Sequence, residues 1–315
     1  MLRNPLLTSN SGNRRLPKRW STSLEATFEI CLTEQPYAQH PRRQLFDPRT
    51  RTRRLPVRPD ATPKGGFVDL SALEKLRKAV RGAVFCPGQD GYDAARSIPN
   101  AMINRRPAAI ARCTGAADVI ACVRFAGEHD LLVSVRGGGH SVAGKSVCDD
   151  GLVIDLSAMR GIHVNPDRKT VRAETGLTLG EFDRETQAFG LATTLGVVSK
   201  TGIAGLTLGG GWGHLHAKYG LALDNVIGAD VVTADGRLLI TNASQNEDLF
   251  WGVRGGSGNF GIVTSLQYRL HELGPVFGGA VFHPVAKAEE VLTFGKASAG
   301  LRVGVPSMAN EKHDF

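Results

Sequence analysis

Beyond about residue 68, apolar residues recur along the chain with two periods. Spacings of three and four residues predict helices with one buried face, and short apolar or alternating runs predict strands. The first of these elements follow the order β-α-β, which is a signature of α/β architecture. The predicted helices are 70–80, 116–129, 179–189 and a short one after 244, and the predicted strands are 84–85, 108–113, 131–135, 152–156, 162–164, 171–173, 229–233, 237–240 and 262–270.

Polar residues mark where several of these elements begin or turn. Thr114 is the expected N-cap of the helix that starts at residue 116. Two Ser/Thr-x-x-Glu spacings predict capping boxes, Thr178 with Glu181 and Ser244 with Glu247. Two turn sequences predict hairpins, Asn165-Pro166-Asp167 and Ala234-Asp235-Gly236.

The first 64 residues differ in composition from the rest. They contain 13 Lys+Arg and 5 Asp+Glu, which accounts for the entire net charge of +8. This Arg- and Pro-rich composition predicts a disordered basic segment. Its first 24 residues are basic, serine-bearing and free of acid, as organelle transit peptides are, whereas a misplaced start or a plain tail is the simpler interpretation.

Charge and cysteine usage limit the function classes. The residues after 64 carry 25 charges of each sign, so no basic field predicts nucleic-acid binding. No apolar run approaches the roughly 20 residues of a membrane span, and we expect a cytoplasmic protein with no membrane partner. The odd number of cysteines, without a C-x-x-C pair, favours buried free thiols over disulfides or zinc: Cys31, Cys86, Cys113, Cys122 and Cys148.

A glycine-rich stretch follows the strand predicted at 131–135. It reads Arg136-Gly137-Gly138-Gly139-His140-Ser141. Glycine permits positive φ and close approach of a ligand, and successive amides after a strand form a concavity that binds anions such as phosphate. His140 lies at its rim, although a plain glycine turn with a solvated histidine remains the alternative. The next predicted element is a strand, whereas a nicotinamide-type Rossmann unit requires a helix there.

Two further stretches combine glycine with apolar residues. They span 195–213 and 254–261, and the first includes Thr201-Gly202-Ile203-Ala204-Gly205. Glycine among apolar residues indicates close backbone approach to a ligand. Tight packing of loops against each other is the alternative.

Taken in order, several motifs resemble one family. The resemblance is to the p-cresol methylhydroxylase/vanillyl-alcohol oxidase (PCMH) type of FAD-binding protein, and most closely to the berberine-bridge-enzyme-like oxidoreductases. It extends from about Gly91 to Pro275. The motifs are Tyr92-Asp93-Ala94-Ala95-Arg96, the stretch Arg136 to Ser141, Thr201 to Leu206, Lys218-Tyr219-Gly220-Leu221-Ala222-Leu223-Asp224-Asn225, and Gly258-Asn259-Phe260-Gly261-Ile262-Val263-Thr264.

The resemblance implies an α+β fold. In it two subdomains hold FAD between them, and residues 65–275 would form this FAD-binding domain, with its core at about 104–275. Residues 276–315 would then be only the start of an α/β substrate domain, with a strand at 279–283 and a helix at 286–294.

The resemblance also assigns residues to the cofactor. His140 would bond covalently to the 8α-methyl of the flavin, and a neutral imidazole nitrogen is a suitable nucleophile. Many relatives carry a second linking cysteine where this chain has Val198, whose alkyl side chain forms no such bond. The remaining expected cofactor contacts are Arg136, Gly137, Gly138, Gly139 and Ser141 at the pyrophosphate, Thr201, Gly202 and Gly205 on the second subdomain, and the backbone of Gly261 and Ile262.

The function expected from this resemblance is oxidation of a small organic substrate. A sugar, alcohol or amine would transfer hydride to the flavin, and oxygen or another acceptor would take the electrons. No catalytic base is assigned, because Lys218 and Tyr219 are as consistent with packing as with chemistry. Two alternatives remain open: an FAD-binding remnant with little or no catalysis, and a metal-dependent hydrolase in which a strand places His214 and His216 beside His140.

Overall fold

The computed structural model describes residues 69–275, 284–287 and 290. Residues 69–275 belong to one structural unit, whereas the short 3-10 helix η3 (Val285–Lys287) belongs to another. The basic segment expected at 1–64, the strand expected at 279–283 and most of the helix expected at 286–294 lie outside the described residues.

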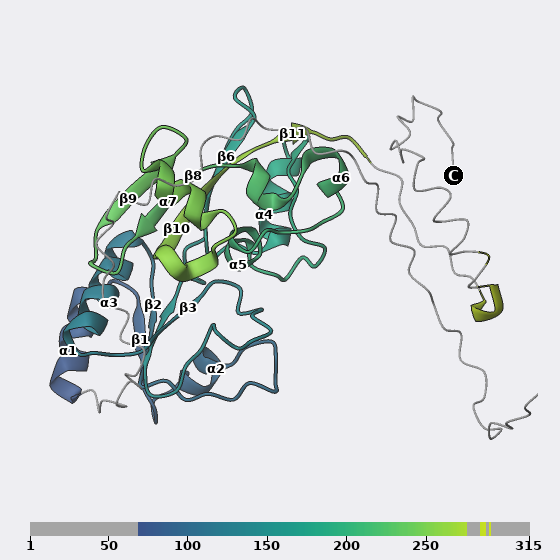
Figure 1. The fold of residues 1–315 in the computed structure, drawn as a ribbon. Coiled ribbons are helices and arrows are strands. Elements are labelled where there is room, and N and C mark those ends of the chain that lie inside the picture. The colour runs from purple at the N-terminus through teal and green to yellow at the C-terminus, as the bar shows by residue number, and fades with distance from the viewer. Residues whose placement is uncertain (1–68, 276–283, 288–289, 291–315) are drawn as a thin grey trace, which may run out of the picture. The chain divides into compact units, whose positions relative to one another are not determined.

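The first half of the described fold is built on a four-stranded sheet with the order β1-β2-β4-β3. Strands β2, β4 and β3 are parallel, and β1 is an antiparallel edge strand. Figure 1 shows α1 and α3 together on one side of this sheet and α2 on the other. The elements are α1 (Leu70–Ala79), β1 (Ala83–Phe85), α2 (Tyr92–Arg96), β2 (Ala109–Arg112), α3 (Ala116–Glu128), β3 (Val133–Arg136) and β4 (Leu152–Asp155).

Both faces of this sheet are buried, as expected for parallel strands. Leu76 of α1 and Val119 of α3 pack with Ile154 on one face. Tyr92 of α2 packs with Ile110 on the other. Continuous apolar runs, rather than alternation, therefore mark these strands in the sequence.

The second half is a five-stranded antiparallel sheet with the order β5-β6-β10-β8-β9. One face carries the larger core, in which Phe182 and Tyr268 meet edge to face with ring centroids 5.3 Å apart. The Tyr268 hydroxyl pairs with the Thr207 hydroxyl at 2.9 Å, so this buried phenol is satisfied. The elements are β5 (Ile162–Asn165), β6 (Thr170–Glu174), α4 (Leu179–Gln187), α5 (Ile203–Leu208), β8 (Val226–Val232), β9 (Leu238–Asn242), α7 (Glu247–Val253) and β10 (Ile262–Arg269).

Short elements complete the described part of the chain. A two-stranded sheet pairs β7 (Leu191–Ala192) with β11 (His271–Glu272). The helix α6 (His216–Tyr219) and two 3-10 helices, η1 (Ala222–Asn225) and η2 (Ser257–Phe260), lie in the connecting segments.

Most elements predicted from the apolar pattern are confirmed, with ends shifted by one to three residues. The Thr178–Glu181 capping box is present, and both predicted hairpins form. β3 and β4 are joined by a loop without a helix, as expected. The described cysteines are free and buried: Cys86, Cys113, Cys122 and Cys148.

Two predicted caps are wrong, for the same physical reason. The N-cap of α3 is Gly115, and the Thr114 hydroxyl instead donates to Asp118 Oδ2 at 3.0 Å. Likewise, Ser244 donates to Asn242 Oδ1, and α7 starts after Asn246 without a side-chain cap. Each helix begins too late for the predicted cap, because Thr114 lies one residue and Ser244 two residues before the actual N-cap.

Candidate cofactor-binding site

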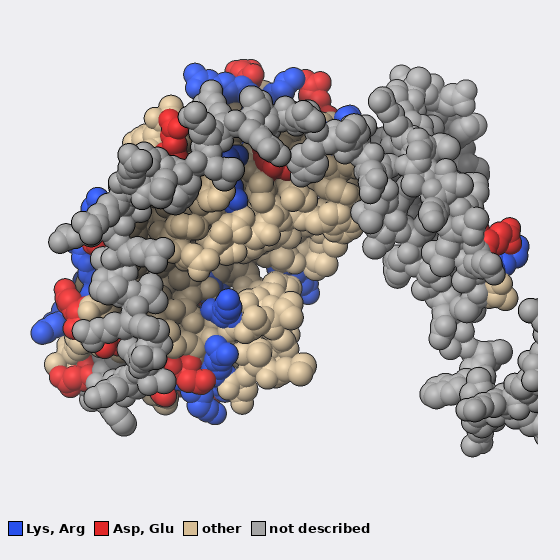
Figure 2. Space-filling view, viewed as in Figure 1, with Lys and Arg blue, Asp and Glu red and all other residues tan. Residues whose placement is uncertain are grey.

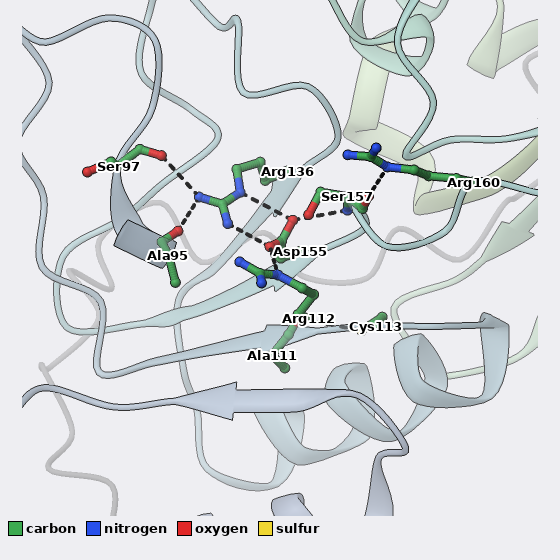
Figure 3. Close-up of polar contacts among 9 residues, drawn as sticks. All are labelled: Ala95, Ser97, Ala111, Arg112, Cys113, Arg136, Asp155, Ser157 and Arg160. Atoms are coloured by element: carbon green, nitrogen blue, oxygen red, sulfur yellow. Dashed lines mark hydrogen bonds and ion pairs between the residues drawn. The ribbon is translucent and has the colours of Figure 1, made fainter. Parts of the chain in front are cut away.

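The first glycine-rich loop begins at an anchored arginine. Arg136 is the last residue of β3, and its buried guanidinium donates to Asp155, the last residue of β4, through Nη2 at 2.6 Å and Nε at 3.2 Å. Nη1 donates to the carbonyls of Ala95 and Ser97. Figure 3 shows these bonds converging on one side chain. The fold therefore engages the guanidinium, and Arg136 can contact a cofactor only through its backbone.

The carboxylate of Asp155 is fully buried and ionised. Burial by itself would raise its pKa, but the hydrogen bonds and charge of Arg136 outweigh burial and hold the pKa below the usual value. Arg112 adds a bond at 3.1 Å, and the Ser157 amide adds another at 3.0 Å. Because a buried carboxylate is stable only when paired, this cluster fixes the ends of β3 and β4 relative to each other.

The amides after Arg136 are free to bind a ligand. Within the described residues, no backbone N–H from Gly137 to Ser141 donates to a protein acceptor. The loop turns at Gly139, where φ is +73°, and His140 is exposed beside it. Successive free amides of this kind suit an anion such as a diphosphate.

The second glycine-rich stretch meets the first. A Cβ built on Gly138 would lie 2.3 Å from the amide nitrogen of Gly202, which immediately precedes α5. The close approach predicted from the glycines is therefore, at these two positions, an approach of one loop to the other. It brings the expected contacts of both subdomains to one place.

The other expected contacts are placed as follows. Thr201 is half-buried, and its carbonyl accepts from the Leu179 amide at 2.8 Å. Gly205 lies in α5 with nothing within 4 Å of its Cβ position, and Val198 is exposed.

Gly261 and Ile262 lie at the start of β10. Gly261 has φ +140° and packs against the Val232 carbonyl, and the Ile262 side chain is buried in the core of the first subdomain. Only the backbone of Ile262 is left to meet a cofactor.

Several buried polar atoms have no hydrogen-bond partner among the residues that the structure describes. They are Ser146 Oγ, Thr193 Oγ1, Thr194 Oγ1, Thr241 Oγ1 and Arg254 Nε. Ser146 follows the first glycine loop, Thr193 and Thr194 precede the second, and Arg254 begins the third. Unpaired buried polar atoms are costly, so the four residues next to these loops in sequence fit a bound polar cofactor, whereas Thr241 lies on β9. Of these residues, only Arg254 carried a signal in the sequence, its place at the head of a glycine-rich stretch.

Lys218 and Tyr219 lie in a packed cluster. The Tyr219 ring stacks on His271 with centroids 3.9 Å apart, and Lys218 Nζ lies 5.0 Å from its centroid. His271 Nε2 lies 2.7 Å from Asn225 Oδ1. Because Asn225 Nδ2 donates to two carbonyls, Oδ1 is the acceptor and Nε2 of His271 carries the proton. These contacts favour a structural role for the motif.

The structure gives no support to the metal-hydrolase alternative. The expected strand at His214 is wrong, because a turn contains that residue and His216 begins α6. His216 Nδ1 is also engaged with the Gly213 carbonyl at 2.8 Å. Across residues 69–275 and the few described beyond, no three His, Cys, Asp or Glu residues are placed to hold a metal ion.

Charged side chains of both signs lie on the surface. On the face shown in Figure 2, basic and acidic side chains lie near one another around the edge, and a few basic ones lie nearer the middle. None of the helices in the described ranges is both long and apolar enough to span a bilayer.

Part of the chain is similar to known FAD-binding proteins. Residues 107–242 match the family described as FAD binding domain. The chain is 41% identical over 195 residues to (R)-6-hydroxynicotine oxidase of Paenarthrobacter nicotinovorans, covering 62% of this chain and 43% of that protein.

Two solved structures are similar in fold. BBE-like 1 of Physcomitrella patens superposes with a TM-score of 0.61 at 32% identity, covering 64% of this chain and 44% of that one. A chitooligosaccharide oxidase superposes with a TM-score of 0.61 at 31% identity, covering 64% and 43%. The chain thus has the PCMH-type fold over its matched part, and it spans about half the length of the curated relatives it matches.

Proposed function

Starting from the FAD-binding domain of berberine-bridge-enzyme-like oxidoreductases that this chain carries, we propose that the protein is an FAD-dependent oxidoreductase. It oxidises a small organic substrate, and oxygen or another acceptor takes the electrons. The observation that carries the proposal is the contact between the Gly138 and Gly202 backbones, which brings two loops with ligand-binding character together.

Different residues of the chain are proposed to contact different parts of the cofactor. The free amides of Gly137 to Ser141 bind the diphosphate, and Arg136 holds their loop through Asp155. Thr201, Gly202 and Gly205 approach from the second subdomain, and the backbone of Gly261 and Ile262 contributes from β10. The flavin supplies hydride acceptance, and the protein supplies binding and orientation.

The substrate is proposed as a sugar, an alcohol or an amine. The names of two similar proteins, a 6-hydroxynicotine oxidase and a chitooligosaccharide oxidase, support amine and sugar chemistry respectively. No residue of the described chain is assigned as catalytic base.

His140 is proposed as the only covalent attachment. It is exposed at the end of the glycine loop. At the position where many relatives carry a second linking cysteine, this chain has the exposed Val198. Forming the bond replaces one hydrogen of the 8α-methyl with a ring nitrogen of His140. The two electrons and two protons released would reduce oxygen to hydrogen peroxide.

The test separates flavin binding from attachment. Protein purified with FAD is precipitated with acid, and visible absorption is measured in pellet and supernatant. In wild type the flavin should remain in the pellet, and in His140→Ala it should move to the supernatant. His214→Ala, which changes an exposed histidine in a neighbouring turn, is the matched control and should behave as wild type. Flavin retained in the His140→Ala pellet would contradict the attachment.

The alternative of an FAD-binding protein with little catalysis gives a different result. Such a protein shows the same flavin absorption but no reduction of its flavin when sugars, alcohols or amines are added anaerobically. Bleaching of the flavin band near 450 nm by any member of that panel supports the oxidoreductase. Purified protein that takes up no FAD at all would overturn both.

A further inference from the structure

A row of residues crosses the face of the five-stranded sheet that lies opposite its core. His163 of β5 pairs with Arg172 of β6, Arg172 with Gln267 of β10, Gln267 with Gly228 of β8, and Gly228 with Asn242 of β9. The residues of the intervening register, such as Leu266 and Ala173, point into the core instead. The five residues of the row therefore share the outer face.

This face is hollowed where the row passes β8. Gly228 has no side chain to fill the surface, and a Cβ there would lie 3.3 Å from Gln267 Oε1. A glycine in the middle of a strand commonly marks the close approach of a ligand or another backbone. Gly228 lines a small hollow, and Arg172 and Gln267 line both this hollow and a neighbouring cavity of about 380 Å³.

Most of the surface lining the larger cavity is apolar, and most of the polar side chains that reach it are unpaired among the described residues. The His163 ring, the Thr170 hydroxyl and the Gln267 amide form no hydrogen bond with any described residue, and neither does the Arg168 guanidinium. Asn165 Oδ1 accepts from the Arg168 amide at 2.9 Å, and the Asn165 Nδ2 group is available as a donor. Most of the available groups can donate, which suits an acceptor-rich ligand.

The arginines near the cavity also favour an acceptor-rich, negatively charged ligand. Arg168 is unpaired, and Arg269 lies opposite Thr170 on the neighbouring strand. The carboxylate of Asp230, which lines the smaller hollow, is already engaged by Arg172 and by the Ser265 hydroxyl at 2.9 Å. The described residues that line the larger cavity itself include two arginines, of which Arg172 is paired with Asp230, and no carboxylate.

We propose that this cavity binds a small metabolite through an oxyanion, a phosphate or a carboxylate, with Arg168 as its main charged contact. Thr170 and Gln267 donate to the same group. The volume is within the range of small-molecule pockets, about 300–1,000 Å³. The site is separate from the cofactor loops, because Ile203 of α5 packs in the core on the opposite face of the sheet.

The test uses isothermal titration calorimetry of the FAD-loaded chain with inorganic phosphate, citrate and sodium chloride at equal ionic strength. We expect saturable binding of phosphate or citrate and none of chloride, and the tighter of the two distinguishes a phosphate ester from a polycarboxylate. Arg168→Gln should weaken that binding about tenfold or more, as loss of a hydrogen bond to a charged group does. The matched control is Arg184→Gln, an exposed arginine on α4 that has no partner among the described residues.

Three results would overturn the proposal: no saturable binding of either oxyanion, equal weakening in both arginine variants, or heats that chloride reproduces. Thr170→Val provides a second, uncharged variant, which should weaken binding without altering net charge. Both arginines are exposed, so unfolding midpoints should match wild type. The proposal does not depend on the oxidoreductase function, since flavin absorption at 450 nm should be the same in all of these variants.

Discussion

The backbones of Gly138 and Gly202 touch, with each Cβ position less than 3 Å from an atom of the other residue. A Cβ on Gly138 would lie 2.3 Å from Gly202 N, and one on Gly202 would lie 2.5 Å from Gly138 N. One residue follows a strand of the parallel sheet and the other precedes a helix packed on the antiparallel sheet. The contact therefore determines where the amides of the two subdomains converge.

We predict that Gly138→Ala destabilises the fold and impairs FAD binding. The added methyl meets backbone, which cannot move aside as a flexible side chain can, and overpacking of this kind costs about 1–3 kcal/mol. Urea unfolding followed by circular dichroism measures the stability, and flavin absorption per protein measures the binding. Gly127→Ala is the control, because nothing lies within 4 Å of its Cβ position in α3. Equal behaviour of the two variants would contradict the assigned contact.

Arg136→Ala should be among the most destabilising single substitutions in the described fold. It leaves the Asp155 carboxylate buried without its main partner, a situation that costs about 3–5 kcal/mol. Arg112→Ala should cost less, because Arg112 is 37% exposed and makes one bond to the same carboxylate. Adding Asp155→Asn to Arg136→Ala should restore part of the loss. A double variant less stable than Arg136→Ala would argue against an uncompensated charge.

His271, whose ring stacks on Tyr219, should make the stability of the fold depend on pH. Burial, assisted by Arg269 and Lys218, lowers the pKa of His271. The unfolded chain then binds a proton more readily than the folded one, so this contribution to stability is complete above about pH 6.5 and is lost as pH falls below it. Melting temperatures from pH 5 to 8 measure this, and His271→Gln should flatten the slope. An unchanged slope in the variant would assign the pH dependence to other groups.

The sequence predicted the helices and strands that depend on apolar periodicity. It failed for local contacts that depend on residues far away in the chain. Apolar spacing located β10 and α3, because burial of one face or stripe is recorded locally. The role of Thr114 was missed because Asp118 also gathers the amides of Arg81 and Gly82, which lie far away in sequence.

The candidate site also combines features that the sequence reveals with features that only the fold creates. The glycine loops were visible from their composition, and their mutual contact was not, since residues 138 and 202 meet only through the fold. The row across the five-stranded sheet was also invisible, because its members come from five separate strands and carry no common motif.

The two predicted capping boxes allow the stability contributed by an N-cap to be measured, because one of them forms and the other does not. Thr178 Oγ1 accepts from the Glu181 amide, and Glu181 bonds back to the Thr178 amide at 2.9 Å, so Thr178→Ala should cost about 1 kcal/mol. Ser244 has the same spacing to Glu247 but makes no bond to α7. Ser244→Ala should therefore change the free energy of unfolding less. A larger loss in Ser244→Ala than in Thr178→Ala would contradict the observed difference.

Replacing Arg254 should have opposite effects on the stability of the cofactor-free protein and on the additional stability that FAD confers. Its Nε is buried without a partner, while its guanidinium carbon lies 4.4 Å from the centroid of the Phe250 ring. Methionine retains an unbranched chain over that ring and removes the orphaned donor, so Arg254→Met should stabilise cofactor-free protein by about 1 kcal/mol. If the guanidinium meets the bound cofactor, the additional stability conferred by FAD should shrink in the variant. Thermal unfolding with and without saturating FAD measures both quantities. A variant that is less stable than wild type without FAD would show that the Arg254 donor is satisfied in solution, and that it does not await a ligand.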